Sequence, residues 1–290
     1  MNIVYLAEIV GKCGIRAVKT LLPKLKMQYR PDYIIANANS ASGAGGLSAQ
    51  HTGYLRKLGI HCLTLGDNAF LNTQIFGGEK TPNFCVRPVN LPRNTAGLGY
   101  KIFHPAVKKA EQADKTTEQK TVTGDLIADN GEKKQKRSIV PVSLVVISLL
   151  GQYGKHRLAA NSPFDALDDV VRRFEACPIV VDYASFSTAE KQTLAFYADG
   201  RVSAVIGSGM KAATADFRVS KNGTAFVTDA GRTGSFLSSG GYEPASKIRE
   251  FKTGLTEYSA SSWEKPQIQG VFIQTAKTGY TIHGERFSIE

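Results

Sequence analysis

Acidic, amide and hydroxyl side chains follow the first three predicted strands of this chain. Glu8 lies at the end of the first strand, Asn39 and Ser40 follow the second, and Asp67 and Asn68 follow the third. Such oxygen atoms would hold at most a loosely bound hard cation, Mg²⁺ or Ca²⁺. An amide does not titrate near neutral pH, so Asn68 is unable to act as a general acid.

The elements that must position these residues alternate between strand and helix. Strands are predicted at 3–9, 33–36 and 61–65, because each stretch is apolar and short. A helix with an apolar stripe follows the first strand, and a second helix is predicted at 51–58. Since α/β proteins place their sites at the carboxyl ends of strands, the polar residues above mark the predicted site.

The second half of the chain repeats this alternation. A helix at 164–175 is expected to join two of its strands, and a β-rich tail follows. The predicted strands are 139–148, 179–182, 203–206, 224–228 and, in the tail, 269–274.

Length and composition favour one large soluble domain over residues 1–290. The chain has 290 residues with 42% hydrophobic content, which is enough for a full core. The longest apolar run, 139–150, is too short to span a bilayer, and the first residues do not resemble a signal peptide. We therefore expect a cytoplasmic protein without a membrane partner.

The cysteines and the net charge give weaker information. Cys13, Cys62, Cys85 and Cys177 lack C-x-x-C spacing, which favours buried free thiols over disulfides or a zinc site. The net charge of +11 raises the question of a nucleic-acid partner. No aromatic residues are interleaved with the basic run 133–137, so solvated charge is the preferred interpretation.

A polar segment at about 105–137 interrupts the domain. Its composition shifts to Lys, Glu, Gln, Thr and Asp, with Leu126 and Ile127 as the main apolar exception. Such a segment buries too little surface to offset its ordering entropy, so we expect an exposed, mobile insertion.

Nine segments resemble, in order, the YmdB-like branch of the calcineurin-type metallophosphoesterases. Only the insertion at 105–137 lies clearly outside the resemblance. The segments are 8–12, 35–40, 64–68, 87–90, 162–164, 181–183, 199–207, 214–216 and 228–234. The resemblance implies a four-layer α-β-β-α sandwich of the metallophosphoesterase type, with two divalent metals that activate a hydroxide against a phosphodiester, typically a 2′,3′-cyclic nucleotide.

This chain departs from the family pattern at the positions that the resemblance assigns to metal ligands. Glu8 stands where the family has an aspartate, and Asn39 where it has a bridging glutamate. Ser40 and Asp67 each replace an asparagine, and Asn68 replaces a proton-donating histidine. A neutral amide in place of the bridging carboxylate removes charge that a dinuclear centre needs.

Three further histidines of the family pattern are also replaced. The matching positions hold Ala184, Gly209 and Lys211. We expect Lys211 to supply part of the lost positive charge by pairing with Glu8 or Asp67, because two converging carboxylates would repel each other. Two alternatives are that Lys211 turns outward or that it attracts a phosphate.

The preferred interpretation is a pseudo-phosphodiesterase with no catalytic residues and no bound metal. It would act as a scaffold or as a binding protein for a nucleotide or protein partner, and the resemblance implies a homo-oligomer. One alternative is a residual phosphodiesterase of cyclic nucleotides or RNA that uses Glu8 and Asp67 with a single weakly bound divalent cation. A second alternative is an RNA-binding protein.

The insertion gives the first testable prediction. Limited proteolysis should cut first within 105–137 and leave the core intact, because this segment lacks a sustained apolar period. Mass spectrometry of the early fragments locates the cut. Early cuts in the core with an intact insertion would contradict the prediction.

Overall fold

The structure of the chain, a computed structural model, describes residues 1–76, 82–104, 143–154, 158–256 and 259–290. The predicted insertion at 105–137 lies outside the described residues. No helix in the described part of the chain is long and apolar enough to cross a membrane. The cysteines in the described ranges, which include all four, are free thiols, and only Cys177 is not fully buried.

The described strands form two sheets. The first has, in spatial order, β2 (Glu8–Ile9), β12 (Arg232–Ser235), β13 (Pro266–Thr275), β1 (Asn2–Leu6), β3 (Tyr33–Asn37), β4 (Cys62–Thr64) and β5 (Cys85–Val86), and β14 (Thr281–Ile289) also pairs with β13. The second has β10 (Arg218–Val219), β11 (Ala225–Val227), β9 (Ala204–Ser208), β8 (Ile179–Ala184), β7 (Leu144–Leu150) and β6 (Tyr100–Phe103).

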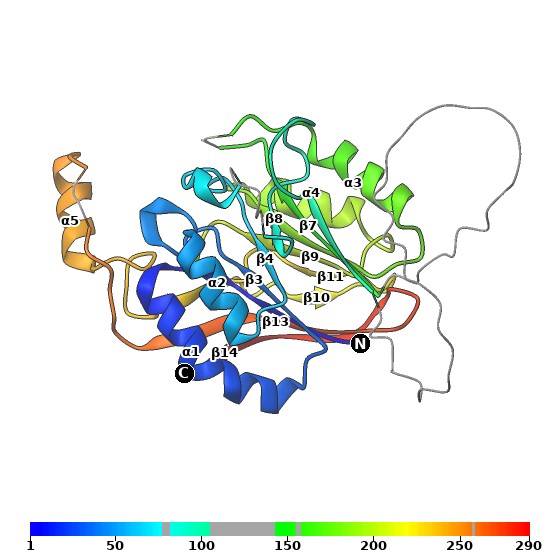
Figure 1. The fold of residues 1–290 in the computed structure, drawn as a ribbon, viewed down its shortest axis with the longest axis horizontal. Coiled ribbons are helices and arrows are strands. Elements are labelled where there is room, and N and C mark those ends of the chain that lie inside the picture. Colours follow the sequence, from blue (N-terminus) through cyan, green and yellow to red (C-terminus); the bar gives the residue numbers. More distant parts are fainter. Residues whose placement is uncertain (77–81, 105–142, 155–157, 257–258) are drawn as a thin grey trace, which may run out of the picture.

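Helices cover the outer face of each sheet. Helix α1 (Gly11–Tyr29) and α2 (Ala49–Leu58) lie on the first sheet, and α3 (Pro163–Arg173) and α4 (Thr188–Tyr197) lie on the second (Figure 1). The inner faces pack against each other through a shared apolar core that includes Tyr5, Ile35, Val146 and Ile206. The four-layer α-β-β-α prediction is confirmed.

Serine residues define where three of these helices begin. The side chains of Ser48, Ser162 and Ser187 each accept a hydrogen bond from a backbone N–H in the first turn of α2, α3 and α4. Such a cap satisfies a donor that the helix leaves without a partner, and it is worth about 1 kcal/mol. These starts fix the loops at the carboxyl ends of the preceding strands.

Most predicted elements are present, but the short strands β5, β6, β10 and β12 were not predicted, and two further corrections apply. The strand predicted at 3–9 is broken at Ala7 into β1, which pairs with β3 and β13, and β2, which pairs with β12. Because of the break, Glu8 pairs with Arg232 of β12, whereas β1 lies between β3 and β13. Helices α4 and α5 (Pro244–Thr253) were not predicted, because the apolar residues of α4 do not form a stripe on one face and α5 has only two large apolar residues, Ile248 and Phe251.

Gly207 lies inside β9, at a close approach to the next strand. A Cβ atom at this position would be 1.9 Å from the carbonyl oxygen of Thr228, so any side chain would push the two strands apart. This glycine is required by packing between strands.

One ion pair is buried completely between α4 and the second sheet. Lys191 Nζ lies 3.1 Å from Asp229 Oδ2, and both side chains are fully buried. The carboxylate also accepts hydrogen bonds from the backbone N–H groups of Met210 and Gly231, each at 2.9 Å. Such a pair contributes little net stability, but the loss of one partner leaves a buried charge without compensation.

We therefore predict that Lys191→Met lowers the free energy of unfolding by about 3–5 kcal/mol at pH 7. Urea denaturation followed by circular dichroism measures this change. Lys57→Met, on the exposed face of α2, is the matched control and should change stability by less than about 0.5 kcal/mol. Equal effects of the two variants would show that the pair is not important for the fold.

Candidate functional site

Glu8, Ser40 and Lys211 meet where β1 ends and β2 begins. The Ser40 hydroxyl donates a hydrogen bond to Glu8 Oε1, and Lys211 Nζ lies 3.6 Å from the same oxygen. The Glu8 side chain is 1% exposed and that of Lys211 is 24% exposed. The ammonium group therefore lies beside the carboxylate, as the substitution argument for Lys211 predicted.

The carboxyl group of Glu8 is not fully satisfied by these contacts. Its second oxygen, Oε2, is buried and has no hydrogen-bond partner among the described residues. Burial raises the pKa of Glu8 above its usual value, and the Lys211 charge and the Ser40 hydrogen bond offset only part of this increase. The charges of Asp229 and Asp67 raise the pKa of Glu8 further.

Asn39 holds the neighbouring loop together. Its Nδ2 donates to Asp67 Oδ1 at 2.9 Å, and its Oδ1 accepts from the backbone N–H groups of Gly66 at 2.8 Å and Asn68 at 3.0 Å. The amide thus uses both its donor and its acceptor within the protein. A glutamate here would offer no donor to Asp67, so the Asn39–Asp67 contact depends on the amide.

The two positions without a functional side chain lie in the same region. A Cβ atom placed on Gly66 would be 2.9 Å from the Cβ of Ala184, which puts Ala184 against the loop that carries Asp67. Gly209 has φ +105° and lies against Ser185, the residue after Ala184. We call the eight predicted residues the strand-end cluster: Glu8, Asn39, Ser40, Asp67, Asn68, Ala184, Gly209 and Lys211.

The backbone of Lys211 is held in place by groups that the sequence interpretation missed. Asp229 accepts the N–H of Met210, and Arg232 Nη1 donates to the carbonyl oxygen of Lys211 at 2.8 Å. Lys211 has φ +59°, a left-handed conformation that most side chains avoid. The segment 228–234 carried part of the resemblance, and that was the available signal for Asp229 and Arg232.

A second buried carboxylate, Asp182, was also missed as part of the site. It is 1% exposed and accepts hydrogen bonds from Ser208 Oγ at 2.6 Å, from Asn37 Nδ2 at 3.0 Å and from the Thr64 hydroxyl. Burial raises the pKa of Asp182. Because Asn37 Oδ1 accepts the N–H of Asn39 at 2.9 Å, this network connects both sheets to the strand-end cluster.

The donor set of the cluster does not fit a dinuclear metal centre. In the described ranges, no group of three or more His, Cys, Asp or Glu side chains could hold a metal ion. Glu8 contacts an ammonium group and Asp67 contacts an amide, so each carboxylate already has a partner. Of the described histidines, His51 contacts Ser42 and His61 accepts from Ile34 N–H, away from the cluster.

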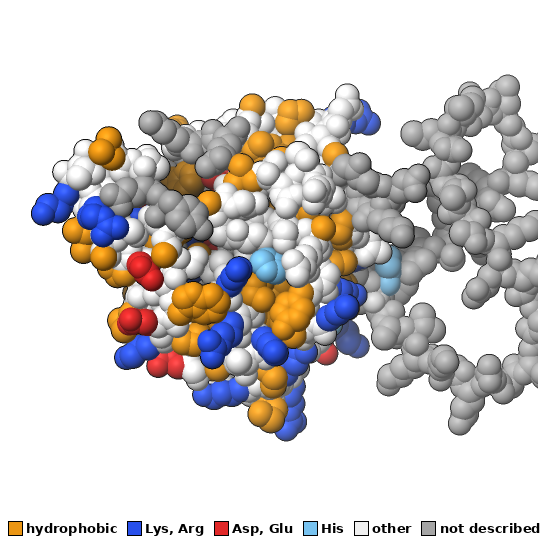
Figure 2. All heavy atoms as spheres, turned by 60° about the vertical axis from the view of Figure 1, so that its left-hand side comes forward, with side chains coloured by type: hydrophobic (Ala, Val, Ile, Leu, Met, Phe, Trp, Pro, Cys, Tyr) orange, Lys and Arg blue, Asp and Glu red, His pale blue; other side chains and the backbone are white. Residues whose placement is uncertain are grey.

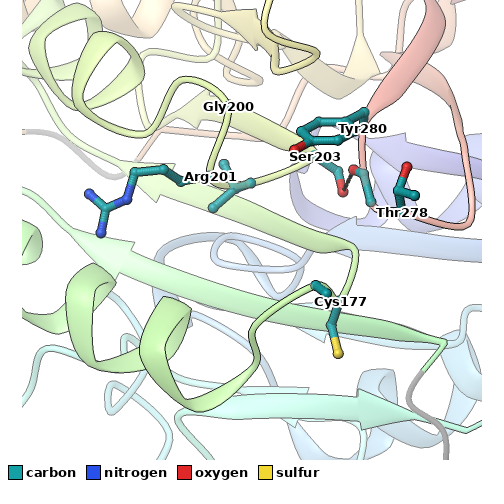
Figure 3. Close-up of a pocket in the computed structure, with 9 residues that line it drawn as sticks. Cys177, Gly200, Arg201, Ser203, Thr278 and Tyr280 are labelled. Carbon is teal, nitrogen blue, oxygen red and sulfur yellow. Dashed lines mark hydrogen bonds between the residues drawn. The ribbon is translucent and has the colours of Figure 1, made fainter.

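Two cavities illustrate where open volume lies. The cavity in Figure 3 measures about 90 Å³ and is lined by Cys177, Ser203 and Tyr280, among others, which is too small for a nucleotide. A larger cavity of about 920 Å³ is lined by Gly11, Lys12 and further residues between α1 and α5. Neither cavity includes a residue of the strand-end cluster, so an open cleft at the cluster stays a prediction.

Relatives with assigned names are phosphatases and phosphodiesterases. The chain is 30% identical over 276 residues, 94% of this chain and 90% of the relative, to a 2′,3′-cyclic-nucleotide 2′-phosphodiesterase from Bacillus subtilis. It is 26% identical over 275 residues, 94% of this chain and 87% of the relative, to a putative phosphatase/phosphodiesterase from Mycoplasma pneumoniae.

Solved structures agree with the fold. A novel phosphatase from Mycoplasma pneumoniae superposes with a TM-score of 0.80 at 25% identity, covering 100% of this chain and 93% of that one. A hypothetical protein from Thermus thermophilus superposes with a TM-score of 0.79 at 24% identity, covering 100% and 99%, and shows the fold alone. The YmdB-like family profile matches residues 4–114 and 129–287. The chain therefore belongs to the YmdB-like protein family.

Proposed function

We propose that this chain is a non-catalytic member of its phosphatase and phosphodiesterase family, one that acts as a scaffold or as a binding protein for a nucleotide or protein partner. The observation that carries the proposal is the Lys211 ammonium group 3.6 Å from Glu8 Oε1. A lysine at this place supplies positive charge to the carboxylate without a metal. It also removes the imidazole that the family pattern has there.

The proposal is supported by the state of the potential ligands. A ligand of a hard cation must turn an oxygen lone pair toward the ion. Glu8 Oε1 already accepts a hydrogen bond from the Ser40 hydroxyl. The side-chain oxygen Oδ1 of Asn39 already accepts hydrogen bonds from two backbone N–H groups. Glu8 Oε2 is buried without a partner among the described residues. The Lys211 ammonium group near Oε1 of the same side chain balances the carboxylate charge, which disfavours a second cation there.

The position at which the family has a proton donor also holds no side chain that could protonate a leaving group. Asn68 replaces the family's proton-donating histidine, and its amide has no ionisable proton. This supports a loss of leaving-group protonation as well as a loss of metal binding. The Asp182 network and the Lys191–Asp229 ion pair instead hold the two sheets and the loops in place.

The partner is proposed from the resemblance and from the cavity beside α1. That cavity offers Lys12 and, from the C-terminal part of the chain, Trp263. A volume of about 920 Å³ lies in the range typical of small-molecule sites. A nucleotide is one ligand of suitable chemistry, since an ammonium group attracts phosphate and an indole ring stacks on a base.

We predict that the protein purified without added metal contains no stoichiometric manganese, iron or zinc. We further predict no turnover of 2′,3′-cyclic nucleotides in added Mn²⁺, because the imidazole ligands are replaced. Elemental analysis and product chromatography on the same preparation check both points, with the Bacillus subtilis relative as the positive control. Metal-dependent turnover that a chelator abolishes would favour the single-metal enzyme through Glu8 and Asp67.

The RNA-binding alternative has a separate outcome. Affinity for single-stranded RNA that falls steeply between low and physiological salt would support it, because the +11 charge would then drive the interaction. Weak binding at physiological salt supports the pseudoenzyme proposal. Either result is independent of the metal analysis.

A further prediction concerns the pH dependence of Lys211→Met. The folded-state pKa of Glu8 is raised by burial, so ionising Glu8 destabilises the folded protein as pH rises from the ordinary glutamate pKa through this raised value. The variant raises the pKa of Glu8 further. We therefore expect a loss of about 1–3 kcal/mol at pH 8 that disappears below the ordinary glutamate pKa, measured by urea denaturation across pH.

Two controls separate charge from packing in this experiment. Lys211→Arg keeps the positive charge and should retain most of the stability at pH 8. Lys221→Met removes an exposed lysine and should leave the pH profile unchanged. A loss in Lys211→Met that is the same at acidic and alkaline pH would mean that the lysine acts through packing alone.

A further inference from the structure

The cavity of about 920 Å³ beside α1 is built from two parts of the chain that lie far apart in the sequence. One side comes from residues 11–51, and the other from residues 242–263. The two parts pack closely next to the cavity, because a Cβ atom on Gly241 would be 2.3 Å from Cγ1 of Val10. None of the described lining residues belongs to the strand-end cluster, so this cavity is a separate place for a ligand.

The first side of the cavity carries a positive charge that is not balanced by a carboxylate. Lys12 lines the cavity and forms no ion pair with a described residue. Burial, and then the charge of Lys12, lower the pKa of His51, which also lines the cavity. Figure 2, in which the side of the molecule that carries α5 comes forward, shows more Lys and Arg than Asp and Glu side chains. This side of the cavity therefore favours an anionic group.

The imidazole ring of His51 is held in place through one of its nitrogens. Its Nδ1 lies 2.7 Å from Ser42 Oγ, and the same hydroxyl oxygen accepts the backbone N–H of Ser48 at 2.9 Å. When the Ser42 hydroxyl donates to Nδ1, Nε2 carries the proton and can donate to a phosphate oxygen. In the loop after Ser42, a Cβ atom on Gly43 or Gly45 would meet no atom within 4 Å, so a ligand can approach the backbone there.

The second side of the cavity offers an aromatic ring and a carboxylate. Trp263 is 48% exposed, and an indole ring can stack on a nucleobase. The ring of Tyr242 is already in contact with Lys247, whose Nζ lies 4.9 Å from the ring centre and 2.7 Å from Glu250 Oε2. Glu243 also lines the cavity, and a carboxylate accepts hydrogen bonds from ribose hydroxyls.

We propose that this cavity binds a nucleoside monophosphate. Lys12 and the Nε2–H group of His51 hold the phosphate, Glu243 accepts hydrogen bonds from the ribose, and Trp263 stacks on the base. A single phosphate fits, because Lys12 is the one lysine without a carboxylate partner among the described lining residues. The proposal rests on the proposed function, since it names the ligand that a non-catalytic member of the family would bind.

Binding of adenosine 5′-monophosphate to the full chain tests the proposal. Trp263 is the only tryptophan in the sequence, so its fluorescence, excited where the nucleotide does not absorb, reports the base contact directly. We expect saturable quenching. Adenosine and inorganic phosphate should each bind at least about 10-fold more weakly in calorimetry, because each lacks half of the contacts. No saturable binding of the nucleotide, or equal affinity for inorganic phosphate, would overturn the proposal.

Two variants separate the phosphate end from the base end. Lys12→Gln should weaken binding of adenosine 5′-monophosphate by about 10-fold or more and leave that of adenosine unchanged, because it removes a charge-assisted contact. Trp263→Leu should weaken binding of both by about 10-fold, measured by calorimetry. Lys19→Gln, two turns further along α1 and outside the lining residues, is the matched control and should bind like the wild type. Unchanged thermal midpoints verify that the variants fold, and equal affinities of the two lysine variants would contradict the phosphate contact.

Failure of this proposal is distinguishable from failure of the proposed function. Turnover of 2′,3′-cyclic nucleotides in added Mn²⁺ would overturn the non-catalytic proposal, whereas binding that depends on Lys12 would still support the cavity site. Absence of both turnover and binding would overturn the cavity site alone. Binding that falls in Lys211→Met but not in Lys12→Gln would place the nucleotide at the strand-end cluster and overturn the assignment to the cavity.

Discussion

The buried Lys191–Asp229 pair is the constraint on which the site region depends. It joins α4 to the end of the second sheet, and the same carboxylate holds the backbone of Met210 and Gly231. Together with the hydrogen bond from Arg232 to the carbonyl oxygen of Lys211, that anchor sets the path of the loop after β9, which brings Lys211 beside Glu8. A charge pair of this kind gives little net stability, but it fixes one geometry because every alternative leaves a buried charge unpaired.

The strand-end cluster is ordered by hydrogen bonds and an ion pair among its own residues and their neighbours. The Asp182 network is built from hydroxyl and amide donors. It reaches Asn39 through Asn37, whose side chain donates to Asp182 and accepts the backbone N–H of Asn39. Asn39 then organises the loop of Asp67 and Asn68, and Lys211 balances Glu8. The region is thus stabilised by hydrogen bonds and one ion pair.

The two-sheet part of the chain and the segment that carries α5 are stabilised differently. In the two-sheet part, the sheets and the helices α1 to α4 bury apolar clusters between the sheets and on the outer face of each sheet. In the segment that carries α5, backbone hydrogen bonds such as that from Phe236 N to Lys265 O join the two ends, while the large apolar side chains of α5 are exposed. Folding of a single copy therefore leaves apolar surface exposed, and a contiguous patch of such surface commonly marks an interaction site.

Apolar periodicity in the sequence indicated most strand positions, because it depends on local spacing, whereas the layer architecture and the residues of the cluster were implied by the resemblance to the YmdB-like family. The sequence also indicated a contact of Lys211 with Glu8 or Asp67, since two converging carboxylates repel each other and favour a counter-charge, and the structure places Lys211 beside Glu8. Only the tertiary structure showed that Asp229 and Arg232 hold Lys211, that the first strand breaks at Ala7, and that α5 faces outward. These features depend on contacts between residues far apart in the chain, which no local pattern encodes.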